Sequence, residues 1–154
     1  MNWNALSSTE KLAVYGSVAT LLGGIIGGTV SALGWLAFLA AIGMLVVVFL
    51  PQFSPSTTLP GSKGSFMLIL GAVAGIVMVL GLLTILSLLG YYFQFAAVNA
   101  IFFLIGVAGG IVMAWAGWQA FQAEGGKFQI GSGGTGAGPG SSAPPPPPPG
   151  APSS

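Results

Sequence analysis

Two long apolar stretches without a single charge dominate this sequence. No residue in 12–50 carries a formal charge, and none in 66–121 does either. As straight helices these stretches would be about 58 and about 84 Å long, whereas the hydrocarbon core of a bilayer is about 30 Å thick. Each stretch therefore has to fold back on itself, which predicts a hairpin of two membrane-spanning helices in each.

Composition points to the same class of protein. Charged residues make up 3% of the chain and apolar residues 54%, whereas a soluble domain carries about a quarter charged residues. Such a composition cannot supply a solvated surface, so we expect an integral all-α membrane protein whose first partner is the lipid bilayer. The net charge of +1 offers no basic patch, and no nucleic acid partner is expected.

Turn-forming residues divide each stretch near its middle. The first midpoint lies at Ser31 in GGTVSALG, where glycines and small hydroxyl residues favour a helix end. The second lies in GYYFQ, residues 90–94, where the tyrosines suit a membrane-water interface. We predict two hairpins in an antiparallel four-helix bundle that occupies residues 12–122, with transmembrane spans at about 12–28, 31–50, 66–89 and 95–118.

Local signals mark the ends of the predicted spans. The sequence SSTE places Ser7 as an N-cap with Glu10 three residues later, which is the pattern of a capping box. After the second span, PQFSPSTTLPGSKGS contains three prolines, which we expect to end the helix and hold the connection extended.

The three lysines indicate an orientation. An even number of spans puts residues 1–11, the connection at 51–65 and the segment after the last span on one side of the membrane, and these carry Lys11, Lys63 and Lys127. The two short turns on the opposite side carry no charge. By the positive-inside rule the lysine side is cytoplasmic, so both termini are predicted to lie inside a plasma or inner membrane.

Small residues at helical spacing predict helix-packing faces. Helices in a bilayer associate where small residues let their backbones approach, although glycine is also frequent in membrane helices generally. The candidates are Gly16, Thr20, Gly23 and Gly27 in the first span, Gly71 and Gly75 in the third, and Asn99, Gly106, Gly110 and Gly117 in the fourth. We expect these faces to pack against the chain itself or another membrane protein. Asn99 should hydrogen-bond a carbonyl, a hydroxyl or another Asn99, because an unpaired carboxamide is costly in hydrocarbon.

The chain lacks the side chains that most site chemistry requires. It contains no histidine, cysteine, aspartate or arginine, and its few ionisable groups fall outside the predicted spans. We therefore predict no catalytic, cofactor-binding or metal-binding residue, and no ion-coupled carrier, which would place a charge inside a span. The sequence GSGGTG at 131–136 matches a dinucleotide-binding pattern in composition only, because glycine and proline runs flank it.

The C-terminal segment 123–154 differs from the rest. It is glycine, proline and serine almost throughout, so it cannot bury a core and is predicted to be disordered. The proline run at 144–149 favours polyproline II, which suits either a spacer or a segment that docks on a polyproline-binding partner.

Two classes of function remain open, and a stand-alone lipid-organising protein lies between them. The first is a non-enzymatic structural or accessory subunit that packs through its glycine-lined helix faces. The alternative is a small pore or passive transporter formed by oligomers and lined by backbone or hydroxyl groups.

Overall fold

The computed structural model describes residues 3–27, 34–54 and 61–128, and this part of the chain is helical. The elements are η1 (Trp3–Ala5), α1 (Ser8–Ile26), α2 (Gly34–Phe53), α3 (Lys63–Ile85), η2 (Leu86–Leu88), α4 (Leu89–Phe95) and α5 (Ala97–Ala123).

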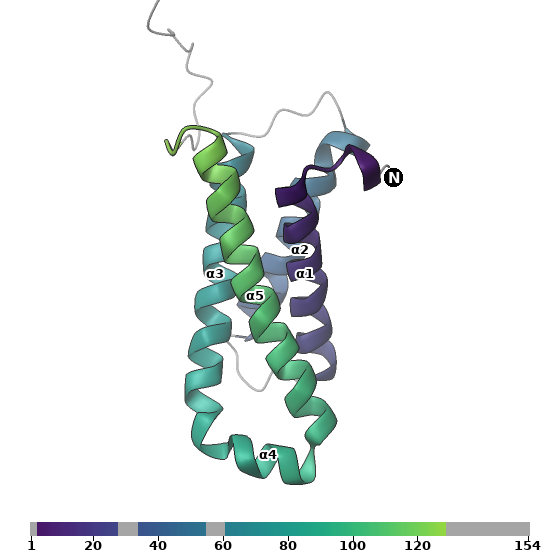
Figure 1. Cartoon of the computed structure of the whole chain (residues 1–154), viewed down its shortest axis with the longest axis vertical. Helices are drawn as coiled ribbons and strands as arrows, with labels where there is room; N and C mark the ends of the chain where they lie inside the picture. The colour runs from purple at the N-terminus through teal and green to yellow at the C-terminus, as the bar shows by residue number, and fades with distance from the viewer. Residues whose placement is uncertain (1–2, 28–33, 55–60, 129–154) are drawn as a thin grey trace, which may run out of the picture.

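Four long helices lie side by side, and the short helix α4 crosses one end of the bundle between α3 and α5 (Figure 1). Helix α1 packs against α2 and α5, and α3 also packs against α2 and α5. The start of α1, the start of α3 and the end of α5 lie at the same end of the bundle (Figure 1). Neighbouring helices therefore run in opposite directions.

In the part of the chain that the structure describes, three helical segments are long and apolar enough to cross a membrane, which indicates a membrane protein. They are Gly34–Phe53, Lys63–Phe95 and Ala97–Ala123. Helix α1 is not among them, because its 19 residues include Glu10 and Lys11 in the first turn and the hydroxyl residues Ser17 and Thr20 further on. A fourth span is thus an expectation of the sequence, and the residue at the end of the predicted span 12–28 lies outside the described residues.

The predicted turn at residues 90–94 is wrong, because this segment is helical. Helix α3 ends at Ile85, η2 continues for one turn, and α4 then runs across the end of the bundle to Phe95. A helix keeps its backbone groups hydrogen-bonded to one another, which an extended turn near hydrocarbon would not do. The third and fourth predicted spans, 66–89 and 95–118, correspond to α3 and to the longer α5.

Helix α2 does not end at the first proline of the connection. It begins at Gly34 and continues through Pro51 to Phe53, and Ser54 N still donates to Leu50 O at 2.9 Å. Proline removes one backbone donor, and this loss is tolerable in a last turn that has little helix left to support. The turn predicted at Ser31 and the remaining prolines of the connection lie outside the described residues.

The end of α5 is closed by two glycines in the left-handed region. Gly125 has φ of 91° and Gly126 has φ of 67°, and Gly126 N donates to Phe121 O at 3.0 Å. This is how many helices end, since glycine adopts positive φ without steric cost. Phe128 then packs against Phe121, with ring centroids 4.7 Å apart and the ring planes tilted by 42°. The rest of the predicted tail, including the proline run, lies outside the described residues.

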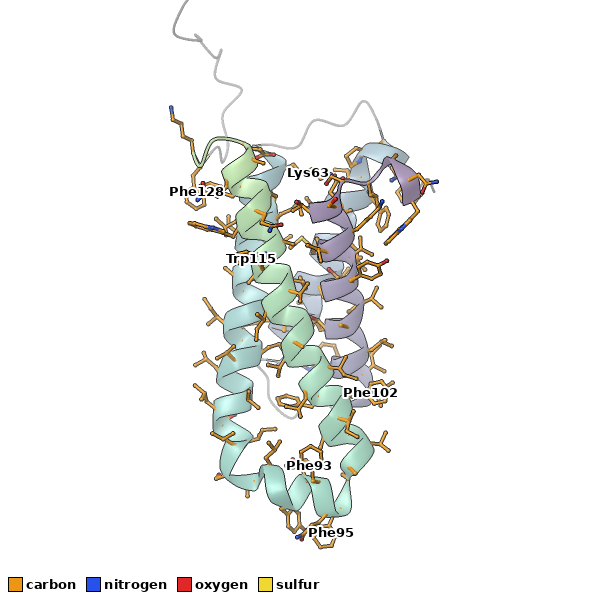
Figure 2. The ribbon with its side chains drawn as sticks, viewed as in Figure 1. Lys63, Phe93, Phe95, Phe102, Trp115 and Phe128 are labelled. Atoms are coloured by element: carbon orange, nitrogen blue, oxygen red, sulfur yellow. The ribbon has the colours of Figure 1, made fainter. Side chains whose placement is uncertain are left out.

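Side chains fill the interior of the bundle, while apolar side chains also cover its outside. The largest fully buried side chains are Met44, Met67, Met113, Val48, Thr20, Ser17 and Ser65. Side chains also project outward along the sides of the helices (Figure 2), and Ile25, Leu39 and Ile76 are each about 60% or more exposed in consequence. An apolar outer surface of this extent suits lipid as the solvent.

Candidate functional site

Three helices bring the charged side chains together at one end of the bundle, which we call the charged end. Glu10 comes from the first turn of α1, Lys63 is the first residue of α3, and Glu124 follows the last residue of α5. Lys63 Nζ forms an ion pair with the Glu10 carboxylate (Lys63 is labelled in Figure 2). The sequence places Lys63 in the connection, but the structure makes it part of a helix and gives it a partner on another helix.

The predicted capping box at the start of α1 is confirmed. Glu10 N donates to Ser7 Oγ at 3.2 Å, and Ser7 N donates to Glu10 Oε2 at 2.7 Å. The second carboxylate oxygen, Oε1, accepts from Lys63. The capping box thus holds the Glu10 carboxylate in the position where α3 can reach it.

The start of α3 is capped from two sides. Ser65 N donates to Ser62 Oγ at 3.2 Å, and Gly64 N donates to Glu124 Oε2 at 2.8 Å. A carboxylate at a helix N-terminus also interacts favourably with the helix dipole. A Cβ on Gly64 would lie 2.5 Å from Glu124 Oε2 and 2.7 Å from Ala120 O, so glycine is what lets the end of α5 approach the start of α3 this closely.

The pKa of the Glu10 carboxyl lies below its ordinary value of 4.5. Partial burial raises this pKa, but the hydrogen bonds from Lys63 and from Ser7 N, together with the positive charge of Lys63, lower it by more. The side chains of Lys63 and Glu10 are 24% and 20% exposed. The Glu10 carboxyl is therefore ionised near neutral pH, and solvent screens the pair only in part.

The charged side chains line a hollow of about 340 Å³ between α1, α3 and α5. Its lining is Ser7, Thr9, Glu10, Lys63, Gly64, Met67, Ala120, Ala123 and Glu124. Beside it, Thr9 Oγ1 donates to Gln119 Oε1 at 3.5 Å. Within the described ranges no group of three metal-ligating side chains occurs, and the carboxylates already accept hydrogen bonds from neighbouring helices. The polar contacts around the hollow therefore join α1, α3 and α5 to one another.

The packing face predicted on α1 lies against α5. A Cβ added to Gly16 would lie 2.8 Å from Gly109 O, and one added to Gly27 would lie 2.6 Å from Phe103 N. Thr20, between them, has its Oγ1 3.5 Å from Gly106 O and 3.6 Å from Met113 Sδ.

Gly23 makes the closest of these approaches. A Cβ there would lie 2.6 Å from Gly106 N and closer still to the Cα of Gly106. The two backbones therefore touch at Gly23 and Gly106, with no flexible side chain between them that could give way.

The single packing face predicted on α5 is divided into two. Gly106 faces α1, whereas Gly110 and Gly117 face α3, where added Cβ atoms would meet the carbonyl oxygens of Ala74 and Met67. Gly109, which the spacing argument did not select, faces α1, since its Cβ would lie 2.6 Å from Gly16 O. The adjacent pair Gly109 and Gly110 is the sequence pattern that indicates two packing faces, because neighbouring residues in a helix point about 100° away from each other.

The packing residues predicted on α3 complete this arrangement. A Cβ on Gly71 would meet the carbonyl of Met113, and one on Gly75 would lie 3.1 Å from Ala114 Cβ and 3.2 Å from Gly110 O. All the glycines selected from the sequence therefore contact another helix of the same chain, and α5 is the helix that the other two share.

Asn99 lies in the first turn of α5 and reaches the end of α1. Its Nδ2 donates to Ile26 O at 3.0 Å, a carbonyl that the end of a helix leaves without an intrahelical partner. A backbone carbonyl is one of the three partners expected for Asn99. Of the predicted topology residues, Lys11 lies in the first turn of α1 and Lys127 just beyond α5, so both lie at the charged end with Lys63.

Comparison of this chain with protein-family models, with curated proteins and with solved structures finds no match. Its function is therefore inferred from the contacts described above.

Proposed function

We propose that this chain is a non-enzymatic membrane subunit with a structural or accessory role, built as a four-span bundle that is closed on itself. The observation that carries the proposal is that the polar groups of the bundle serve its own packing. In residues 3–27, 34–54 and 61–128, no buried side-chain nitrogen or oxygen lacks a hydrogen-bond partner. A site for catalysis or ion transport needs polar groups that are free to meet a substrate.

The assignment of α1 as a fourth span is supported by its length and its two faces. Beyond Glu10 and Lys11, residues 12–26 of α1 extend about 22 Å, which is most of the thickness of the hydrocarbon core. Its hydroxyl groups face inward: Ser17 Oγ donates to Ala13 O at 2.7 Å, and Thr20 lies against α5. Val18, Leu22 and Ile25 are exposed on the other side, where lipid would meet them.

In the proposed orientation, the protein lies in the plasma or inner membrane, with the charged end and both termini in the cytoplasm. Lys11, Lys63 and Lys127 share the charged end, and no residue in 64–123 carries a charge. The positive-inside rule places such an end inside. The C-terminal tail, which begins at this end, is then available in the cytoplasm for a polyproline-binding partner or as a spacer.

The proposed partner is a second copy of the chain or another membrane protein, but the glycine faces are not the contact. Those faces lie against α1, α3 and α5 of the same chain. A partner would have to meet the outer surface or the tail instead. The alternative of a pore is disfavoured for a single copy, because Met44, Met67 and Met113 fill the interior.

Purification in mild detergent followed by reconstitution into liposomes tests the proposal. The expected result is that a membrane protein co-purifies in fixed stoichiometry, or that the chain forms a defined oligomer, and that vesicles containing the chain retain a small trapped dye. A chain that purifies alone as a monomer and makes dye-loaded vesicles leak would contradict the structural role and favour the pore.

A further inference from the structure

The two halves of the bundle differ in length at the end opposite the charged end. Gly27, just beyond α1, lies against Phe103, and a Cβ added to Gly81 would lie 3.8 Å from Phe103 Cζ. Ala37, near the start of α2, packs in the same cluster as Phe103. Leu82 packs in this cluster as well, and Asn99 Nδ2 reaches Ile26 O at the end of α1. Helices α1 and α2 therefore stop at the level of Leu82 and Asn99, while the residues between these two continue past them. We call residues 82–99 the far hairpin.

The far hairpin is exposed and apolar. None of its residues from 82 to 99 is buried, and the large side chains that it exposes include Leu83, Leu86, Leu88, Tyr91, Phe93, Phe95 and Val98. Phe95 is 72% exposed and points away from the bundle, whereas Phe93 points back toward it (Figure 2). An exposed apolar surface of this kind marks a contact with lipid or with a partner.

Helix lengths identify lipid headgroups as the contact. From Lys63 to Leu88 the chain rises about 39 Å, and the 27 residues of α5 rise about 40 Å, at 1.5 Å per residue. A bilayer is about 30 Å thick in its hydrocarbon core and about 40 to 45 Å thick with its headgroup regions. When the charged end lies in one headgroup layer, α4 therefore lies in the other.

The direction and the side chains of α4 suit that layer. The helix runs across the bundle axis, and so parallel to a membrane plane that the bundle crosses (Figure 1). Its sequence LGYYFQF combines phenylalanines, which prefer acyl chains, with tyrosine hydroxyls and a carboxamide that can reach water. The far hairpin carries no charge, and a charge would be expected if it projected into water toward a soluble partner.

We propose that the far hairpin is a lipid-binding surface, with α4 lying in the headgroup layer of the leaflet opposite the lysines. This inference rests on the membrane-crossing orientation of the proposed function. The inference also predicts a depth in the membrane. Spin labels attached to α4 should lie closer to the membrane surface than spin labels attached at the start of α2, by the rise of about six residues, or about 9 Å.

Spin labels measure this depth directly, because the chain has no cysteine and single-cysteine variants can be labelled at one position. Phe95→Cys reports on α4, and Leu88→Cys provides a second position if the first variant does not fold. Trp35→Cys marks the start of α2, Val73→Cys the middle of the bundle and Lys127→Cys the aqueous phase. The full chain is reconstituted into phosphatidylcholine liposomes, and depth is measured from collision rates with oxygen and with a water-soluble nickel chelate.

The expected result is a label at position 95 in the headgroup layer, about 9 Å shallower than the label at 35. A label at 95 as accessible to the nickel chelate as the one at 127 would overturn the proposal and favour a protein partner in water. A label at 95 as deep as the one at 73 would overturn it as well, since the bilayer would then enclose the hairpin.

A membrane-impermeant maleimide separates failure of this inference from failure of the proposed function. If cysteines at 95 and 127 react from the same side of the liposome, the four-span arrangement itself is wrong. If they react from opposite sides while the label at 95 is fully aqueous, the bundle crosses the membrane and the lipid contact alone is wrong.

Discussion

At the charged end, side chains of three helices bind one another, whereas at the α4 end the far hairpin extends past its neighbours with residues 82–99 unburied. Glu10, Lys63 and Glu124 link α1, α3 and α5 through an ion pair and helix caps. The contacts at the charged end form within the chain. The apolar side chains of the far hairpin instead contact the surrounding solvent, so their free energy depends on whether that solvent is lipid or water. We therefore expect substitutions in the packed bundle to reduce stability and matched substitutions on α4 to leave it nearly unchanged.

The largest contrast is expected from the same substitution at two glycines. In Gly23→Ala the new methyl group would meet the backbone of Gly106, which cannot move without separating α1 from α5. We expect a loss of about 3 kcal/mol in the free energy of unfolding, as for other overpacked sites. Reversible unfolding in mixed micelles, followed by circular dichroism, measures it.

Gly90→Ala in α4 is the matched control. No atom lies within 4 Å of a Cβ at Gly90, so the free energy of unfolding should stay within about 1 kcal/mol of the wild type, on the stabilising side. Equal losses in the two variants would show that the α4 end is packed as tightly as the middle of the bundle.

A smaller loss is expected when the ion pair at the charged end is broken. Lys63→Gln removes the charge that faces Glu10 while it keeps most of the side chain. We expect a loss of about 1 kcal/mol, since the pair is partly buried yet still reached by solvent. A double-mutant cycle with Glu10→Gln should give a coupling energy of similar size, and a coupling near zero would mean that the pair contributes nothing to stability.

Acid should weaken the charged end and leave the α4 end unaffected. Because the pKa of Glu10 is lowered in the folded state, its contribution to stability is fully present above 4.5 and is lost as the pH falls through the folded pKa, below 4.5. The melting temperatures of wild type and Glu10→Gln should therefore converge as the pH is lowered below 4.5. A constant difference over that range would contradict the assigned pairing.

The smallest effect is expected from Glu124→Gln. The amide keeps an oxygen that can accept from Gly64 N but loses the negative charge at the start of α3. The exposed position of Glu124 limits the expected loss to about 0.5 kcal/mol at low salt, with less at high salt. Measurement of thermal unfolding at two salt concentrations distinguishes this charge effect from a loss of packing.

Several features could be predicted from the sequence because their causes are local. The capping box needs only Ser7 and Glu10, which are three residues apart. The length of the apolar stretches requires helices that fold back. The glycine spacing also selected residues that lie at helix contacts, although it could not say which helix each one faces, because that depends on the arrangement of the whole bundle.

Other features depend on contacts between distant parts of the chain. Lys63 and Glu10 are 53 positions apart, and the residues around either one do not indicate that the two form a pair. Helix α5 has two packing faces because α1 and α3 lie on either side of it. As a result Gly109 contacts α1, whereas Gly110 contacts α3. The tyrosines at 91 and 92 predict a membrane interface, and that stays a prediction. Composition could not distinguish the expected turn from the helix that is observed.

The central claim is that these helices pack against one another within a single chain, and a cross-linking test addresses it most directly. Thr9 of α1 and Gln119 of α5 lie within hydrogen-bond distance at the charged end, with 3.5 Å between Oγ1 and Oε1. The double variant Thr9→Cys with Gln119→Cys should give a cross-linked monomer when membranes are treated with a short bis-methanethiosulfonate reagent that bridges the two thiols, with each single variant as its control. A cross-linked dimer that forms only in the double variant would mean that α1 of one copy packs on α5 of another, and would contradict the closed bundle.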